Sequence, residues 1–121
     1  MISTVFVRFT FEGWHRWPDA PPEHDYLAAR HRHLFHVEAH AHVDHHNRDL
    51  EFIALKRKLL AWCLYLASCE VGEHLGTTPT TLGVGSWSCE TWALQLLQAH
   101  PVLTEVSFSE DGENGARLVR P

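Results

Sequence analysis

Strict alternation of apolar and polar residues in two segments constrains the fold of this chain more than any other feature. The first segment, residues 2–12, directs its apolar residues to one side: Val5, Val7, Phe9 and Phe11. The second segment, residues 34–44, does the same: Phe35, Val37, Ala39, Ala41 and Val43. A period of two is that of a β-strand with one buried face. The alternation therefore predicts two strands that pair with each other, with a bend at Gly13 ending the first.

The second half of the chain changes period. Residues 50–67 carry apolar side chains at spacings of three and four, which predicts an amphipathic helix. Residues 88–99 predict a second helix, which Ser88 can cap. Residues 103–110 alternate again, and the turn sequence "DGENG" separates them from a last strand expected at 116–120.

Two remaining segments, 13–30 and 72–85, lack a sustained period and are rich in proline, glycine or threonine, so we expect long loops there. The resulting order of elements is β-β-α-α-β-β. It predicts an α+β fold with an antiparallel four-stranded sheet and both helices on one face. A length of 121 residues is enough for a single domain, spanning 1–121.

Composition excludes several classes of protein. The net charge of −5 offers no basic footprint for nucleic acid, so we expect no nucleic-acid partner. Apolar runs fall short of the roughly 20 residues that span a membrane, so we expect no membrane partner. Three cysteines without CxxC spacing indicate reduced thiols in a cytoplasmic protein and argue against a thiolate zinc site.

Histidines are concentrated in one stretch: residues 29–46 hold seven of the eleven. His31 and His33 point to the same side of an extended segment. If the first two strands pair as a hairpin, His15 lies close to both. Three histidines leave one tetrahedral position open, which is the catalytic arrangement for zinc. The histidines of 36–42 either line a cavity wall or face solvent.

Five motifs in order resemble the 6-pyruvoyl-tetrahydropterin synthase and 6-carboxy-tetrahydropterin synthase family, over roughly residues 5–115. They are "FTFEGWH" at 9–15, "RHRHLFHVEA" at 30–39, "LEFIALKRKL" at 50–59, "SCETWALQLL" at 88–97 and "EVSFSED" at 105–111. The resemblance implies the T-fold and zinc bound by His15, His31 and His33. It also implies that Glu110 binds the N–H edge of the pterin, and that Glu90 lies in the substrate pocket.

The same resemblance implies an activity and an assembly. The activity is that of a zinc-dependent lyase on a 7,8-dihydropterin such as dihydroneopterin triphosphate. The product is a 6-carboxy- or 6-pyruvoyl-tetrahydropterin, and the former belongs to the deazapurine (queuosine) route. The assembly is a homo-oligomer, a hexamer built as a dimer of trimers, whose barrel would be lined by the polar strand face.

The chain also departs from the family pattern. Leu27 stands where the family has its reactive cysteine, and Arg32 replaces the glycine between the zinc histidines. Glu73 and His74 are the best candidates for the acid/base pair. Candidates to replace the cysteine are Glu23, His24 and Asp25, with Cys69 and Cys89 more remote. Two alternatives therefore stay open: a pterin- or purine-binding protein that keeps the metal but not the lyase step, and a protein without metal.

Overall fold

The computed structural model describes residues 1–68 and 84–121. The regular elements, in chain order, are β1 (Ser3–His15), β2 (His31–Val43), α1 (Phe52–Ser68), α2 (Cys89–Ala99), β3 (Leu103–Glu110) and β4 (Asn114–Val119). Two short 3₁₀ segments, η1 (Pro22–Leu27) and η3 (Val84–Ser86), lie in the connections. No helix within the described ranges is both long and apolar enough to cross a membrane.

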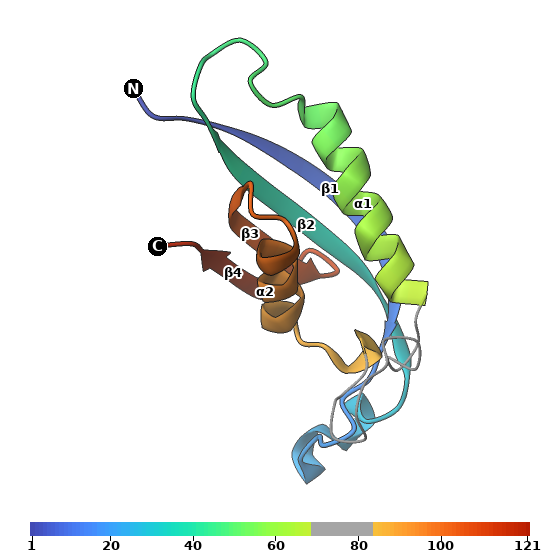
Figure 1. Ribbon diagram of the computed structural model, residues 1–121. Helices are drawn as coiled ribbons and strands as arrows, with labels where there is room; N and C mark the ends of the chain where they lie inside the picture. The colour runs from blue at the N-terminus through green and yellow to red at the C-terminus, as the bar shows by residue number, and fades with distance from the viewer. Residues whose placement is uncertain (69–83) are drawn as a thin grey trace.

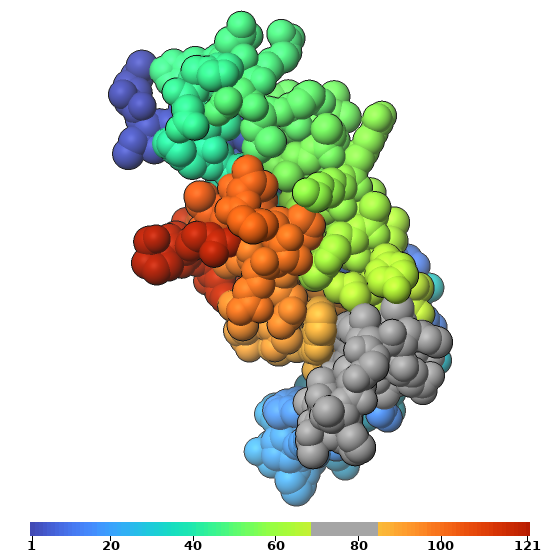
Figure 2. Space-filling view, in the orientation of Figure 1, coloured from blue at the N-terminus to red at the C-terminus, as the bar shows by residue number. Residues whose placement is uncertain are grey.

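The four strands form one antiparallel sheet in the order β1-β2-β3-β4, with helices packed on it, which confirms the predicted α+β class (Figure 1). Helix α1 packs along β1, and α2 lies over β3 and β4. In the space-filling view the two helices cover much of the sheet, and the segment around η1 projects at one end (Figure 2).

One apolar core joins the inner face of the sheet to both helices. Its largest fully buried side chains include Phe35, Phe108, Leu59 and Leu96. The ring of Trp92 in α2 stacks on Phe108 at a centroid distance of 5.2 Å. Each such aromatic buries a large apolar area, so these contacts dominate the packing of helix on sheet. Ser88 caps α2 as predicted: its hydroxyl accepts a hydrogen bond from the Thr91 backbone N–H at 3.1 Å.

Gly13 does not bend the chain as predicted, and β1 runs through it to His15. A Cβ at this position would lie 2.9 Å from Cε2 of Phe35 on the neighbouring strand. The glycine therefore makes room for a buried ring rather than for a turn. Strand β2 correspondingly begins at His31, three residues before the predicted start. The two strands pair without a register shift from Ser3↔Val43 to His15↔His31.

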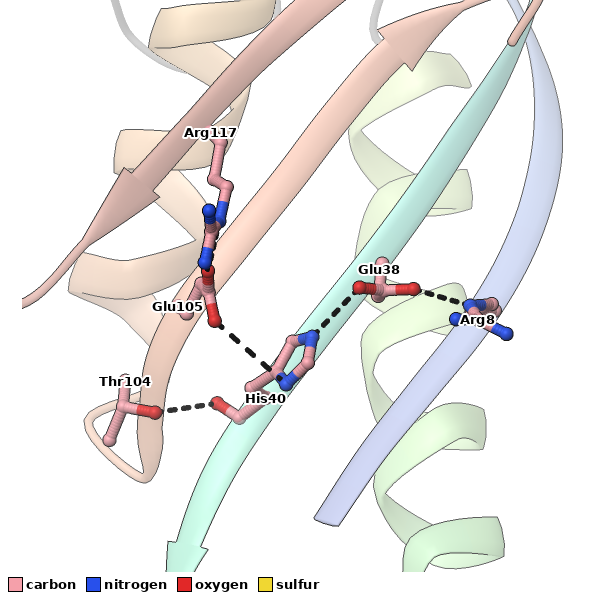
Figure 3. Close-up of polar contacts among 6 residues, drawn as sticks. All are labelled: Arg8, Glu38, His40, Thr104, Glu105 and Arg117. Atoms are coloured by element: carbon pink, nitrogen blue, oxygen red, sulfur yellow. Dashed lines mark hydrogen bonds and ion pairs between the residues drawn. The ribbon is translucent and has the colours of Figure 1, made fainter. Parts of the chain in front are cut away.

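The outer face of the sheet carries a row of polar side chains from all four strands, joined by hydrogen bonds and ion pairs (Figure 3). Arg8 on β1 pairs with Glu38 on β2, and His40 Nε2 donates to Glu38 Oε2 at 2.8 Å. His40 Nδ1 lies 3.9 Å from Glu105 Oε2 on β3, and Glu105 pairs with Arg117 on β4. Hydrogen bonds from His40 and then Arg8 lower the pKa of Glu38. On the polar side of the predicted second strand, Glu38 and His40 thus belong to a network of hydrogen bonds and ion pairs across the sheet.

Candidate metal centre and its pocket

Strand pairing brings three histidines together at one end of the sheet. His15 is the last residue of β1 and lies opposite His31, the first residue of β2, while His33 lies opposite Gly13. All three continue the inner rows of Phe11 and Phe35, because residues two apart share a strand face. One ring nitrogen from each histidine lies within 4.8 Å of the other two. Within the described ranges, no other group of three or more such donor side chains comes together in this way.

Hydrogen bonds orient the rings of the His31–His33 pair. His31 Nδ1 donates to the Ala29 carbonyl at 2.8 Å, which puts the lone pair on Nε2, the nitrogen that lies within hydrogen-bond distance of His15 Nδ1. His33 Nδ1 donates to Asp111 Oδ2, also at 2.8 Å, and puts the lone pair on Nε2 there too. Metal-binding histidines show this pattern, in which the nitrogen that does not bind the metal donates to a carbonyl or a carboxylate.

The ring nitrogens that face one another lie close enough together to hold a small divalent ion. Nε2 of His33 is buried, with no hydrogen-bond partner among the described residues. Nε2 of His31 lies 3.2 Å from Nδ1 of His15. Two nitrogen ligands of tetrahedral zinc, each about 2.05 Å from the ion, would be roughly 3.3 Å apart. The three histidines can therefore hold a metal ion, and three imidazole nitrogens are a donor set that suits zinc.

Electrostatics favour the metal-binding form of His15. The pKa of His15 is lowered to about 4, chiefly by burial and then by the neighbouring His31 and His33, against an opposing backbone hydrogen bond with Trp87. The imidazole is therefore neutral at neutral pH, and only a neutral imidazole offers a lone pair to a metal.

A pocket of about 610 Å³ opens beside this cluster. His15 and His31 line one part of it, and the two predicted substrate-binding carboxylates, Glu90 and Glu110, line another. Glu110 ends β3 on the same sheet face, and its Oε2 lies 3.5 Å from His33 Nε2. The remaining lining residues are Trp17, Asp19, Leu27, Ser86, Ser88, Cys89, Thr91, Asn114 and Gly115.

Leu27 and Cys89 both line this pocket. The family's cysteine position is thus an apolar side chain inside the pocket. The thiol of Cys89 comes from α2 instead, but burial, with added repulsion from Glu110 and Glu90, raises its pKa to about 12. Cys89 is therefore a protonated thiol at neutral pH and not a thiolate.

Several predicted residues are not brought into this site. Glu23, His24 and Asp25 lie on η1 with exposed side chains, and none of them lines the pocket. The ring of His24 instead stacks on the ring of Trp17, with the two ring centroids 6.2 Å apart. Glu73, His74 and Cys69 fall outside the residues that the structure describes.

Sequence reasoning missed Asp111, which contacts His33 from the turn between β3 and β4. The two residues are 78 positions apart, so no local pattern links them. The backbone N–H of Leu34 lowers the pKa of Asp111 most, followed by the hydrogen bond from His33, so the carboxylate is ionised at neutral pH. The available signal was the Asp-Gly pair of a tight turn, which predicts the turn but not its neighbour.

No family model matches the chain, and no curated protein matches it by sequence. The family resemblance noted above therefore remains a prediction.

Proposed function

We propose that this chain is a zinc-dependent lyase with a T-fold that acts on a 7,8-dihydropterin, of the 6-pyruvoyl- or 6-carboxy-tetrahydropterin synthase type. One observation carries the proposal: His15, His31 and Glu110 line a single pocket, and the ring of His33 lies next to both histidines and 3.5 Å from Glu110. A volume of about 610 Å³ lies within the usual range for small-molecule sites, about 300–1,000 Å³.

The residues of the pocket divide into binding and chemical roles. The carboxylate of Glu110 can accept two parallel hydrogen bonds from the guanidine-like N–H edge of a pterin. Leu27 and Trp17 supply apolar surface against a flat heterocycle, and Glu90 sits in the first turn of α2, where a carboxylate is favoured by the helix dipole. Zinc held by the three histidines would polarise the side-chain oxygens of the substrate. Glu73 and His74 are the proposed acid/base pair.

A second candidate function is a pterin- or purine-binding protein that retains the metal site without the lyase reaction. Two residues that line the pocket favour it. Leu27 cannot act as a base, and the thiol of Cys89 is protonated at neutral pH. Among the described residues of the pocket, the groups that could still act as a base are then the histidines and three carboxylates: Asp19, Glu90 and Glu110.

Turnover separates the two candidates. Zinc-loaded protein would be incubated with dihydroneopterin triphosphate and the products separated by chromatography. Formation of a 6-carboxy- or 6-pyruvoyl-tetrahydropterin supports the lyase, and the carboxy product would place the chain in the deazapurine (queuosine) route. Binding without turnover supports the second candidate. Absence of both contradicts the pterin assignment.

Glu110→Ala tests the substrate contact in the same assay. Pterin binding should weaken by about 10-fold or more, because a carboxylate bonded to two N–H groups is lost, while zinc stays bound. Glu113→Ala is the matched control, since Glu113 is an exposed carboxylate in the adjacent turn. Zinc loss in Glu110→Ala would instead make Glu110 a metal ligand.

The proposal includes a homo-oligomer, a hexamer formed as a dimer of trimers in the cytoplasm. In the described part of the chain β1 and β4 are the edges of the sheet, and pairing with other copies would close them. The charged outer face would then line the central tunnel. Light scattering coupled to gel filtration tests this, and a monomeric mass would contradict it.

A further inference from the structure

Hydrogen bonds attach the turn between β3 and β4 to β2, beside His33 of the proposed metal site. The backbone N–H of Asp111 donates to the Leu34 carbonyl at 2.7 Å, and the Leu34 N–H donates back to Asp111 Oδ1 at 2.9 Å. The second carboxylate oxygen, Oδ2, accepts from His33 Nδ1 at 2.8 Å. The first bond fixes the backbone of Asp111, the second fixes its carboxylate, and the third acts on the histidine.

The backbone of the turn is built to present this side chain. Asp111 and Gly112 have φ values of 56° and 71°, and the Glu113 N–H donates to the Glu110 carbonyl at 3.0 Å. Aspartate and glycine are among the few residues that adopt this left-handed conformation readily. The turn follows directly on β3, which pairs with β2, so the Asp111 carboxylate reaches the His33 ring from the neighbouring strand.

A carboxylate in this place determines which ring nitrogen of His33 carries the proton. An ionised carboxylate only accepts hydrogen bonds, so Nδ1 must be the protonated nitrogen. In the neutral ring the lone pair then resides on Nε2, the buried nitrogen that lacks a hydrogen-bond partner among the described residues and lies 3.5 Å from Glu110 Oε2. His31 is held in the same tautomer, but by the neutral Ala29 carbonyl.

We propose that Asp111 is a positioning residue of the metal centre, which holds His33 in the Nδ1–H tautomer and aims its Nε2 at the ion. The inference rests on the three-histidine metal site of the proposed function but not on its pterin substrate. The negative charge behind the ring also raises the basicity of Nε2, and loss of such a partner typically weakens metal binding about 10- to 100-fold.

The test is a zinc titration of the metal-stripped full-length chain against a chromophoric chelator. Asp111→Ala should bind zinc about 10- to 100-fold more weakly than wild type. Asp111→Asn should fall between the two, because the amide oxygen can still accept from Nδ1 but carries no charge. Glu113→Gln, which removes a carboxylate from the same turn away from His33, should bind zinc like wild type.

A nitrogen–proton correlation NMR spectrum of the imidazoles reports the tautomer of His33. This tautomer would not change if Asp111 only stabilised the fold. In the metal-free wild type, His33 should be the Nδ1–H tautomer, and Asp111→Ala should populate both tautomers. If Asp111→Ala fails to fold, Asp111→Asn and the wild-type spectrum decide.

Three results would overturn the inference. They are wild-type zinc affinity in folded variants at position 111, an Nε2–H tautomer of His33 in the wild type, and failure of the wild type to bind zinc at all. No pterin enters the experiment, so a chain without lyase activity can still give the expected result.

Discussion

His31 offers the sharpest test of the metal site at the scale of a single residue. Its side chain contributes one of three nitrogen donors and is only half-buried, so its removal costs little packing. We expect His31→Ala to weaken zinc binding by more than about 100-fold, because two imidazoles alone hold the ion poorly. Zinc content measured by mass spectrometry checks this. His42→Ala, on the outer face of the same strand, should keep full occupancy; full occupancy in His31→Ala would mean that the ligand assignment is wrong.

His100 makes a second prediction at this scale, about pH. It is buried at the end of α2, donates from Nδ1 to the Leu96 carbonyl at 3.0 Å, and packs against the ring of Trp62. Burial lowers its pKa, with the charge of Lys58 acting in the same direction and the Leu96 hydrogen bond opposing. The unfolded chain therefore takes up this proton at a higher pH than the folded chain does. Its contribution to stability is complete above about pH 6.5 and is lost as the pH falls below that value.

Urea unfolding at pH 7 and pH 5 measures this effect. The free energy of unfolding of the wild type should drop between the two, and His100→Gln should show a smaller drop because it cannot titrate. His46→Gln, at an exposed histidine, should follow the wild type. An equal pH dependence in His100→Gln and wild type would show that His100 titrates normally in the folded state.

At the scale of the strands, Gly13 couples the packing of β1 to the geometry of the site. In Gly13→Ala the new methyl group would meet the Phe35 ring at 2.9 Å, and that ring lies 5.8 Å from the His33 ring. Because Phe35 is fully buried, the variant should lose about 1–3 kcal/mol in the free energy of unfolding. Zinc affinity should fall as well.

Chemical denaturation and zinc titration of one preparation check both effects. Thr10→Ala, an outward-facing change on the same strand, should cost about 0.5 kcal/mol or less. If Gly13→Ala matched it in stability and zinc affinity, the glycine would have no packing role.

The strands and helices also show where sequence reasoning reaches its limit. Alternation and helical spacing predicted five of the six regular elements, because each buries one face against the core. The turn sequence "DGENG" predicted the sixth, β4, which begins at Asn114 rather than at residue 116. The strand ends were missed at Gly13 and His31, because the inner row stops being apolar where it becomes the metal site. The hairpin did bring His15 to the His31–His33 pair as predicted. Asp111 was not predicted, because its contact with His33 depends on how β3 pairs with β2, which only the folded sheet determines.

At the scale of the whole molecule, the three histidines of the proposed metal site and Asp111 connect every strand of the sheet at one end. His15 comes from β1, His31 and His33 come from β2, and Asp111 comes from the turn that joins β3 to β4. An ion bound there would stabilise only the folded arrangement, because the unfolded chain separates these residues. Zinc should therefore raise the thermal stability of the entire domain and not just order a loop.

The size of this effect follows from mass action. At a free zinc concentration 100 times the dissociation constant, the folded state gains about 2.7 kcal/mol. For a chain of 121 residues this raises the unfolding temperature on the order of 10 °C.

Calorimetry with increasing zinc measures the rise in unfolding temperature, and a chelator should reverse it. Magnesium should have little effect because it prefers oxygen ligands. His33→Ala should remove the zinc response, since the buried Nε2 that the ion would satisfy is gone. An unfolding temperature independent of zinc would mean that the three histidines share a strand face without binding a metal.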